Sequence, residues 1–243
     1  MTDVHGNHVA YAEIPQPAAA LVILNEVVLE IPDPGGEPLP PARLPEASLP
    51  LTYLQTEQEL VNAYRQPVWK DEAALLAKWV SGLPGGTQPR NAYRTARWLT
   101  GSIHQQITYR RRSERGTQSP ATTLQLGTGS CRDMATLGTE ALRALGMPAR
   151  FVSGYLNSAV SAAGLGSTHA WLEVYFPDGG WRGFDATSGR ATGPDHIPTG
   201  VCAHPRGVMP ISGSFDNTTG SSLGMKVELT IRRDSPAAPA PYP

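Results

Sequence analysis

The 243-residue chain lacks the features that mark several large classes of protein. It has only two cysteines, Cys131 and Cys202, which are too few for a disulfide framework and favour reduced thiols. Its formal net charge of −1 gives no broad attraction to nucleic acid or anionic lipid. We therefore expect no nucleic-acid partner, and we interpret the charged run at 110–115 as a solvated loop.

Long apolar runs are also missing. The longest, AAALVILNEVVLEI, is interrupted by Asn25 and Glu26 and is too short to span a bilayer. The first residues show no basic segment followed by an apolar core, so no secretory signal is visible. These observations predict a cytoplasmic protein with no membrane partner, and they leave the oligomeric state open.

The order of patterns along the chain predicts an α+β protein. Residues 1–50 read as a partial β region followed by a linker rich in proline and glycine. Residues 51–234 read as the main unit, and the tail at 235–243 has a composition typical of disorder. Within 51–234 we expect four helices, at 56–64, 69–83, 91–107 and 131–145. Three strands are expected after them, at 149–156, 169–176 and 181–187. A loop-like stretch at 187–224 and a last strand at 225–233 complete this unit.

The sequence GTGSCRD at 127–133 places Cys131 at the expected start of a helix. With Ser130 as the N-cap, the thiol would lie in the positive field of the helix end, which favours the thiolate. Gly127 and Gly129 would let a substrate approach closely. The alternative is a small buried residue at a helix start, since free cysteine is often buried.

A nucleophilic cysteine needs a base and a group that orients the base. His169 opens a predicted strand, and Asp185 follows 16 residues later on the next one. A two-residue hairpin turn would project Asp185 away from His169, whereas a three-residue turn at Pro177–Gly179 would put both on one face. Each residue alone also has a structural reading, as a packing histidine and as a turn or capping aspartate.

Four motifs in this order resemble the transglutaminase-like superfamily, particularly its bacterial members. They are GSCRD, GMPARFVSGY, HAW and GFDAT, and the resemblance extends over about residues 60–200. It implies a papain-like core, with a cysteine-bearing helix packed on an antiparallel sheet, and a triad of Cys131, His169 and Asp185. The segments at 3–14 and 21–31 resemble the later part of a small β domain that precedes the core in this group, while the family's Gly-Arg-Asp turn is replaced here by Val-Cys-Ala-His-Pro-Arg.

These residues predict acyl transfer on an amide or peptide bond through a thioester. We expect hydrolysis of a peptide or protein substrate, with protein-glutamine amine transfer or a non-catalytic peptide-binding module as alternatives. Gln125, six residues before Cys131, is a candidate oxyanion donor by analogy with papain-like proteases. No cofactor and no metal are expected, because Cys131 and His169 lack the paired spacing of a zinc motif, and Cys202 is interpreted as a bystander.

Overall fold

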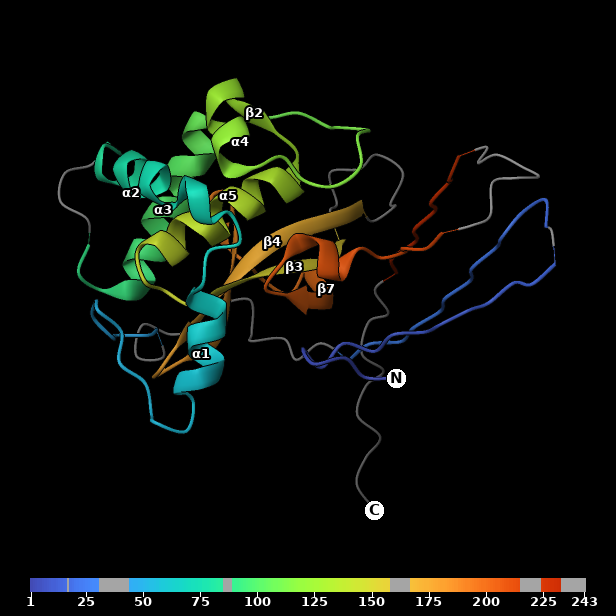
Figure 1. Cartoon of the computed structure of the whole chain (residues 1–243), viewed down its shortest axis with the longest axis horizontal. Helices are drawn as coiled ribbons and strands as arrows, with labels where there is room; N and C mark the ends of the chain where they lie inside the picture. The colour runs from blue at the N-terminus through green and yellow to red at the C-terminus, as the bar shows by residue number, and fades with distance from the viewer. Residues whose placement is uncertain (17, 31–43, 85–88, 158–166, 215–223, 233–243) are drawn as a thin grey trace, which may run out of the picture.

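The computed structural model describes residues 1–16, 18–30, 44–84, 89–157, 167–214 and 224–232. The helices are α1 (Gln58–Arg65), η2 (Lys70–Glu72), α2 (Ala73–Ser81), α3 (Ala92–Gln106), α4 (Pro120–Leu126), α5 (Cys131–Ala144) and η3 (Pro205–Val208). The strands are β1 (Thr108–Tyr109), β2 (Thr128–Gly129), β3 (Ala149–Leu156), β4 (Ser167–Phe176), β5 (Gly180–Asp185), β6 (Arg190–Ala191) and β7 (His196–Cys202). In Figure 1 the helices α2 to α5 form a group against a five-stranded sheet, α1 lies apart from them, and β1 and β2 pair in a separate two-stranded sheet.

The five-stranded sheet is antiparallel, with the strand order β6-β5-β4-β3-β7, and α5 packs on its centre. The closest approach is at Gly138, where a Cβ would lie 2.3 Å from Leu172 Cδ2 of β4. The apolar faces of α2, α3 and α5 meet the sheet in one core that includes Leu76, Leu99, Leu137, Leu142, Leu172, Phe176 and Phe184. The expected α+β class, with the cysteine helix on an antiparallel sheet, is confirmed.

The hairpin between β4 and β5 has the three-residue turn that brings the predicted site together. Leu172 pairs with Phe184 and Phe176 pairs with Gly180, so continuing the register places Asp185 opposite Trp171. Gly180 has φ +64, the left-handed conformation that a three-residue hairpin commonly needs. The side chains of His169 and Asp185 therefore share one face of the sheet.

Two predictions about the C-terminal part of the main unit, after residue 187, are wrong. The stretch expected to be loop-like at 187–224 contains β6 and β7, because an edge strand tolerates Pro198 and Gly200 where a central strand would not. Residues 224–232, within which we expected the last strand, are extended but form no strand. Their alternating apolar residues find no neighbouring strand to pair with among the described residues.

The N-terminal β-type segments also form no strand within residues 9–16 and 18–30, and their apolar side chains are exposed. Figure 1 shows this part of the chain extending away from the helices and the sheet. Only the first residues contact the main unit, where Asn7 exchanges two hydrogen bonds with the backbone of Val201 on β7. Most of the predicted linker and the predicted disordered tail lie outside the described residues, and the division into domains stays a prediction. None of the helices in the described ranges is long and apolar enough to cross a membrane.

Candidate active site

Cys131 is the first residue of α5, as its sequence predicts, and its side chain is half-buried. Ser130 precedes it in extended conformation, so the first backbone N–H groups of the helix are directed toward the same region as the thiol. The helix dipole at this end stabilises negative charge. A small apolar cluster lies beneath the thiol and contains Ala135, Phe151, Ala170, Cys202 and Val208.

The loop that presents Cys131 is anchored by Asp133, which is fully buried. Its carboxylate accepts hydrogen bonds from the N–H and hydroxyl of Ser130, from the N–H of Gln118 and from the guanidinium of Arg112 at 2.7 Å. Burial raises the pKa of Asp133, but these donors outweigh it and hold the pKa below its ordinary value. Asp133 is therefore a charged anchor at the base of the cysteine helix.

The charged run at 110–115 is thus not a wholly solvated loop, as we expected. Arg112 turns inward to Asp133, because a buried carboxylate needs a cationic partner. Arg132 donates to the backbone carbonyls of Arg112 and Glu114. Both arginines fix the loop that precedes α4.

The strand β1 runs parallel to β2 immediately before Cys131, and Tyr109 pairs with Gly129 in this ladder. The pKa of Tyr109 is raised, first by partial burial and then by the nearby charge of Cys131. The phenol is half exposed. Tyr109 is therefore a half-exposed neighbour of the thiol, and the sequence did not predict this position.

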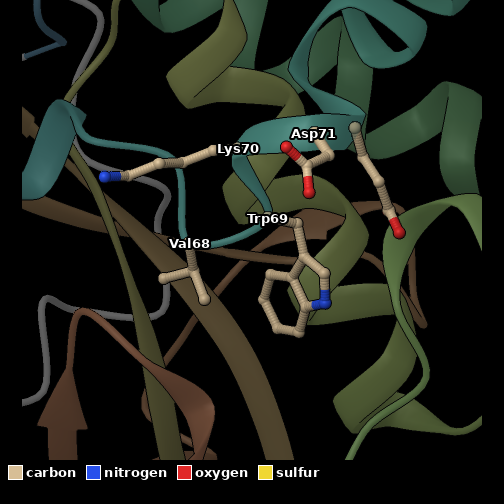
Figure 2. A pocket seen from close by; sticks show the side chains of 5 residues that line it. Val68, Trp69, Lys70 and Asp71 are labelled. Atoms are coloured by element: carbon tan, nitrogen blue, oxygen red, sulfur yellow. The ribbon is translucent and has the colours of Figure 1, made fainter.

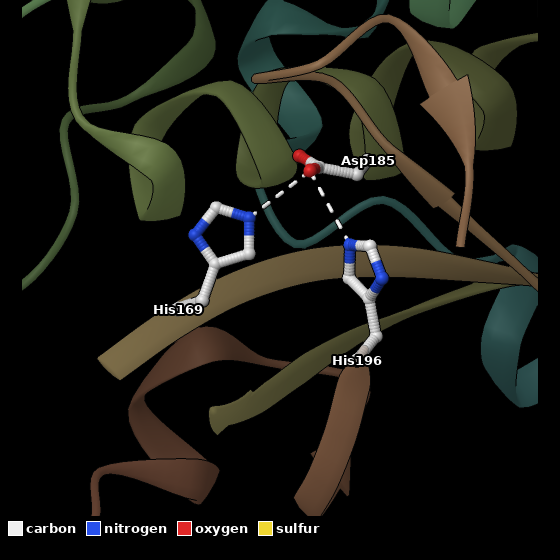
Figure 3. Close-up of side chains that lie close together, drawn as sticks. All are labelled: His169, Asp185 and His196. Atoms are coloured by element: carbon white, nitrogen blue, oxygen red, sulfur yellow. Dashed lines mark hydrogen bonds and ion pairs between the residues drawn. The ribbon is translucent and has the colours of Figure 1, made fainter. Parts of the chain in front are cut away.

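His169 and Asp185 form a buried pair. His169 Nε2 lies 3.1 Å from Asp185 Oδ2, and the two residues are 8% and 2% exposed. Figure 3 shows the other ring nitrogen of His169 directed away from Asp185. Burial lowers the pKa of His169, but hydrogen bonding to Asp185 and to the Cys131 thiol, together with the charges of both groups, raises it to about 9.

Asp185 accepts more hydrogen bonds than a triad would require. His196 Nε2 lies 3.4 Å from the same Oδ2 atom (Figure 3). The N–H of Thr187 donates to Oδ1 at 2.8 Å. Burial raises the pKa of Asp185, and the bonds from these groups and from His169 lower it far below its ordinary range. The carboxylate is therefore an anion held by three donors. The sequence analysis missed His196 because it placed this residue in irregular chain.

Three potential metal ligands converge at this point, since donor atoms of His169, Asp185 and His196 all lie within 4.8 Å of one another. A histidine that binds a metal through Nε2 keeps its proton on Nδ1 and usually donates it to an acceptor. In His196, however, Nδ1 faces a donor, the N–H of Gly193 at 3.2 Å. The donor set therefore fits two imidazoles bonded to a carboxylate better than a metal centre.

Gln125, the predicted oxyanion donor, lies on α4 with its side chain exposed. In the part of the chain that the structure describes, no hydrogen bond links it to the loop around Cys131. A different glutamine, Gln118, lies against this loop: its N–H binds Asp133, and its Oε1 would be 3.5 Å from a Cβ at Gly129. The proposed role of Gln125 stays a prediction without support from the geometry.

A pocket of about 370 Å³ lies beside η2 and is lined by Val68, Trp69, Lys70, Asp71 and Glu72 (Figure 2). The N–H groups of Val68 and Trp69 are fixed by Glu140 of α5 at 2.8 and 3.1 Å. The ring of Trp69 stacks on His204, two residues after Cys202. Trp69 thus packs against the segment that follows Cys202, which belongs to the apolar cluster beneath Cys131.

Comparison with known proteins agrees with this geometry. Residues 77–186 match the family model of the transglutaminase-like superfamily. An uncharacterized protein of Mycobacterium leprae (strain TN) is 33% identical over 106 residues, covering 42% of this chain and 37% of that protein. An uncharacterized protein of Mycobacterium tuberculosis (strain ATCC 25618 / H37Rv) is 28% identical over 243 residues, covering 93% of this chain and 75% of that protein.

Among solved structures, one from Cytophaga hutchinsonii that is described as a candidate cysteine protease has a TM-score of 0.54 and 24% identity. The match covers 65% of this chain and 53% of that one, and it shows a shared fold. The match of the family model extends from α2 to the residue after Asp185, and it thus includes the cysteine helix and the strands that bear His169 and Asp185. Residues 77–186 of the chain therefore match the transglutaminase-like superfamily in sequence, and they contain Cys131, His169 and Asp185.

Proposed function

We propose that this protein catalyses cysteine-dependent acyl transfer on amide or peptide bonds, with hydrolysis as the overall reaction. The observation that carries the proposal is the buried His169–Asp185 pair at 3.1 Å, whose imidazole also interacts with a thiol at a helix N-terminus. This arrangement supplies a nucleophile, a base and a group that orients the base. The high pKa of His169 favours an imidazolium beside a Cys131 thiolate at neutral pH.

In the first half-reaction, the Cys131 thiolate attacks the carbonyl carbon of the substrate. The negative charge that develops on the carbonyl oxygen is stabilised by backbone N–H groups at the start of α5. As the carbon–nitrogen bond breaks, the His169 imidazolium gives its proton to the leaving amine, and a thioester on Cys131 results. Asp185 keeps the proton of His169 on Nε2 in the neutral ring, so that Nδ1 is free to work on the substrate side.

In the second half-reaction, neutral His169 accepts a proton from water as the water oxygen attacks the thioester carbonyl. The carbon–sulfur bond breaks, the carboxylic acid leaves, and the thiolate–imidazolium pair is restored. We favour water as the acceptor because it is always present and no site for an amine can be identified among the described residues.

Two alternatives use the same fold. A primary amine could replace water, which would give protein-glutamine amine transfer. The fold could also bind peptides without turnover, and the intact set of Cys131, His169 and Asp185 argues against that.

The test compares the two cysteines. At pH 6, iodoacetamide should label Cys131 much faster than Cys202, and an unfolded protein substrate should release new amino groups with the wild-type and Cys202→Ala proteins but not with Cys131→Ala. A fluorescent primary amine added to the same reaction separates the acceptors, because only amine transfer incorporates it into the substrate. Slow and equal labelling of both thiols would favour the non-catalytic module.

A further inference from the structure

The strand order makes the position of His196 unexpected. β6 and β7 lie at opposite edges of the sheet, yet only residues 192–195 connect them. The N–H of Thr192 binds the carbonyl of Gly183 on β5, and the N–H of Asn157, which follows β3, binds the carbonyl of Asp195. Between Thr192 and Asp195 the connection therefore crosses from β5 to the end of β3, and it delivers His196 to Asp185 although β4 and β3 separate β5 from β7.

The hydrogen bonds of His196 define its tautomer. The N–H of Gly193 donates to Nδ1 at 3.2 Å, so Nδ1 must carry a lone pair and the ring proton must be on Nε2. Nε2 in turn lies 3.4 Å from Asp185 Oδ2, which can only accept. A doubly protonated ring would place Nδ1–H against the N–H of Gly193. The ring is therefore a neutral donor.

Packing holds this ring in place. Trp171 of β4 contacts it edge to face, with centroids 5.2 Å apart and planes at 83°, and the side chain of His196 is only 12% exposed. Among the described residues, the charged or titratable groups in recorded contact with it are Asp185 of β5 and His169 of β4, whose ring centroid is 6.0 Å away. A rigid neutral donor aimed at Oδ2 restricts rotation of the carboxylate that His169 depends on.

We propose that His196 is a positioning residue: as a neutral ring with its proton on Nε2, it donates a hydrogen bond to Asp185 and holds that carboxylate in register with His169. The proposal rests on the function proposed above for Cys131, His169 and Asp185. His196 does not touch the substrate, and it acts through Asp185 alone.

The tautomer is tested first, by ¹⁵N NMR of the imidazole nitrogens in the full-length Cys131→Ala protein at pH 7, with His196→Gln used to assign the signals. We expect an unprotonated Nδ1 and a protonated Nε2. An imidazolium at this position, or a proton on Nδ1, would overturn the proposal. This readout needs no substrate and no active cysteine, so it stands even if the proposed function fails.

The positioning role is tested by two variants on the wild-type background. His196→Leu removes the donor, whereas His196→Gln keeps an amide N–H near the place of Nε2. Hydrogen bonds to charged groups predict a loss of about tenfold or more in the rate of Cys131 alkylation at pH 6 for His196→Leu, and a loss of less than about threefold for His196→Gln. With a substrate, the same loss should fall on kcat rather than on KM.

A structural role alone would give a different result. His196→Leu would then lower the thermal unfolding temperature but leave the alkylation rate of the folded protein equal to that of the wild type, and that outcome would refute the positioning role. If instead wild-type Cys131 is no more reactive than Cys202, it is the proposed function that fails, and the two failures are distinguished.

Discussion

The two cysteines of this chain form a natural comparison, because each lies beside a histidine. Cys131 is half-buried at the start of α5 and interacts with His169, which is bonded to a buried carboxylate. Cys202 is buried at the end of β7, with its Sγ 3.3 Å from His5 Nε2. The other ring nitrogen of His5 lies 2.9 Å from the hydroxyl of Tyr64, not from a carboxylate.

The difference shows that contact between a thiol and an imidazole is not enough to stabilise an imidazolium. A phenol cannot offer the negative charge that stabilises an imidazolium at neutral pH, whereas Asp185 does so for His169. Cys202 also lacks a helix N-terminus, since it ends a strand. The sequence led us to interpret Cys202 as a bystander, and in the structure it is a buried thiol beside His5 with the surroundings of a packed residue.

The largest effect on turnover should come from changing Asp185, which is hydrogen-bonded to His169, and a matched change can be made at Tyr64, which is hydrogen-bonded to His5. Asp185→Asn should keep the fold and lower turnover by about 10³- to 10⁴-fold, because the amide can no longer hold the correct tautomer or the charge of His169. Tyr64→Phe makes the matched change behind His5 and should leave turnover within about twofold, as expected for a hydrogen bond remote from the reacting atoms. Initial rates on one protein substrate measure both, and equal losses in the two variants would remove the distinction between the cysteines.

The next effect is on the free energy of unfolding, and it concerns Asp133, the buried carboxylate that anchors the Cys131 loop. Asp133→Asn should destabilise the protein by about 3–5 kcal/mol, because it leaves the half-buried guanidinium of Arg112 without its buried carboxylate. Urea unfolding followed by circular dichroism measures the free energy of unfolding. The control is Glu114→Gln, which removes the exposed carboxylate that also pairs with Arg112 and should cost less than about 1 kcal/mol. An Asp133→Asn protein as stable as this control would contradict the anchoring role.

The third effect is the pH dependence of the stability that His169 and Asp185 contribute as a pair. Folding raises the pKa of His169 from its ordinary 6.5 to about 9, so its contribution to stability is complete below pH 6.5 and is lost as the pH rises through about 9. The free energy of unfolding of the wild type should therefore fall between pH 6.5 and 9.5 relative to that of His169→Gln. Parallel urea titrations of the two proteins give this difference, and a difference that does not vary with pH would show that the pair is not charged in the native state.

The smallest effect should be on substrate binding near Cys202. If substrate enters the pocket beside η2, Trp69→Ala removes an aromatic side chain from its lining and the stacking on His204, so we expect KM to rise about 3- to 30-fold, with no change in Cys131 alkylation. Leu54→Ala, an exposed site on another surface, is the control. An unchanged KM would separate this pocket from the substrate site.

Local patterns predicted much of this site. The glycine-rich approach and Ser130 predicted the helix start at Cys131, and of the two hairpin turns that the sequence left open, the structure has the three-residue turn, which places Asp185 on the face of His169. These are short-range features, because helix caps and hairpin registers are set by residues a few positions apart. Some partners from farther along the chain were not predicted, as for Arg112 with Asp133.

The sequence by itself determined the cysteine helix, the hairpin and the residues that converge on the proposed thiolate–imidazolium pair. Only the tertiary structure decided that His196 reaches Asp185, that His5 reaches Cys202, and that residues 196–202 form a strand. The physical reason is that these contacts depend on a chain crossing the end of a sheet and on an N-terminal segment docking at its edge. Neither event leaves a periodic pattern in the sequence, since each is held by a few hydrogen bonds between residues distant along the chain.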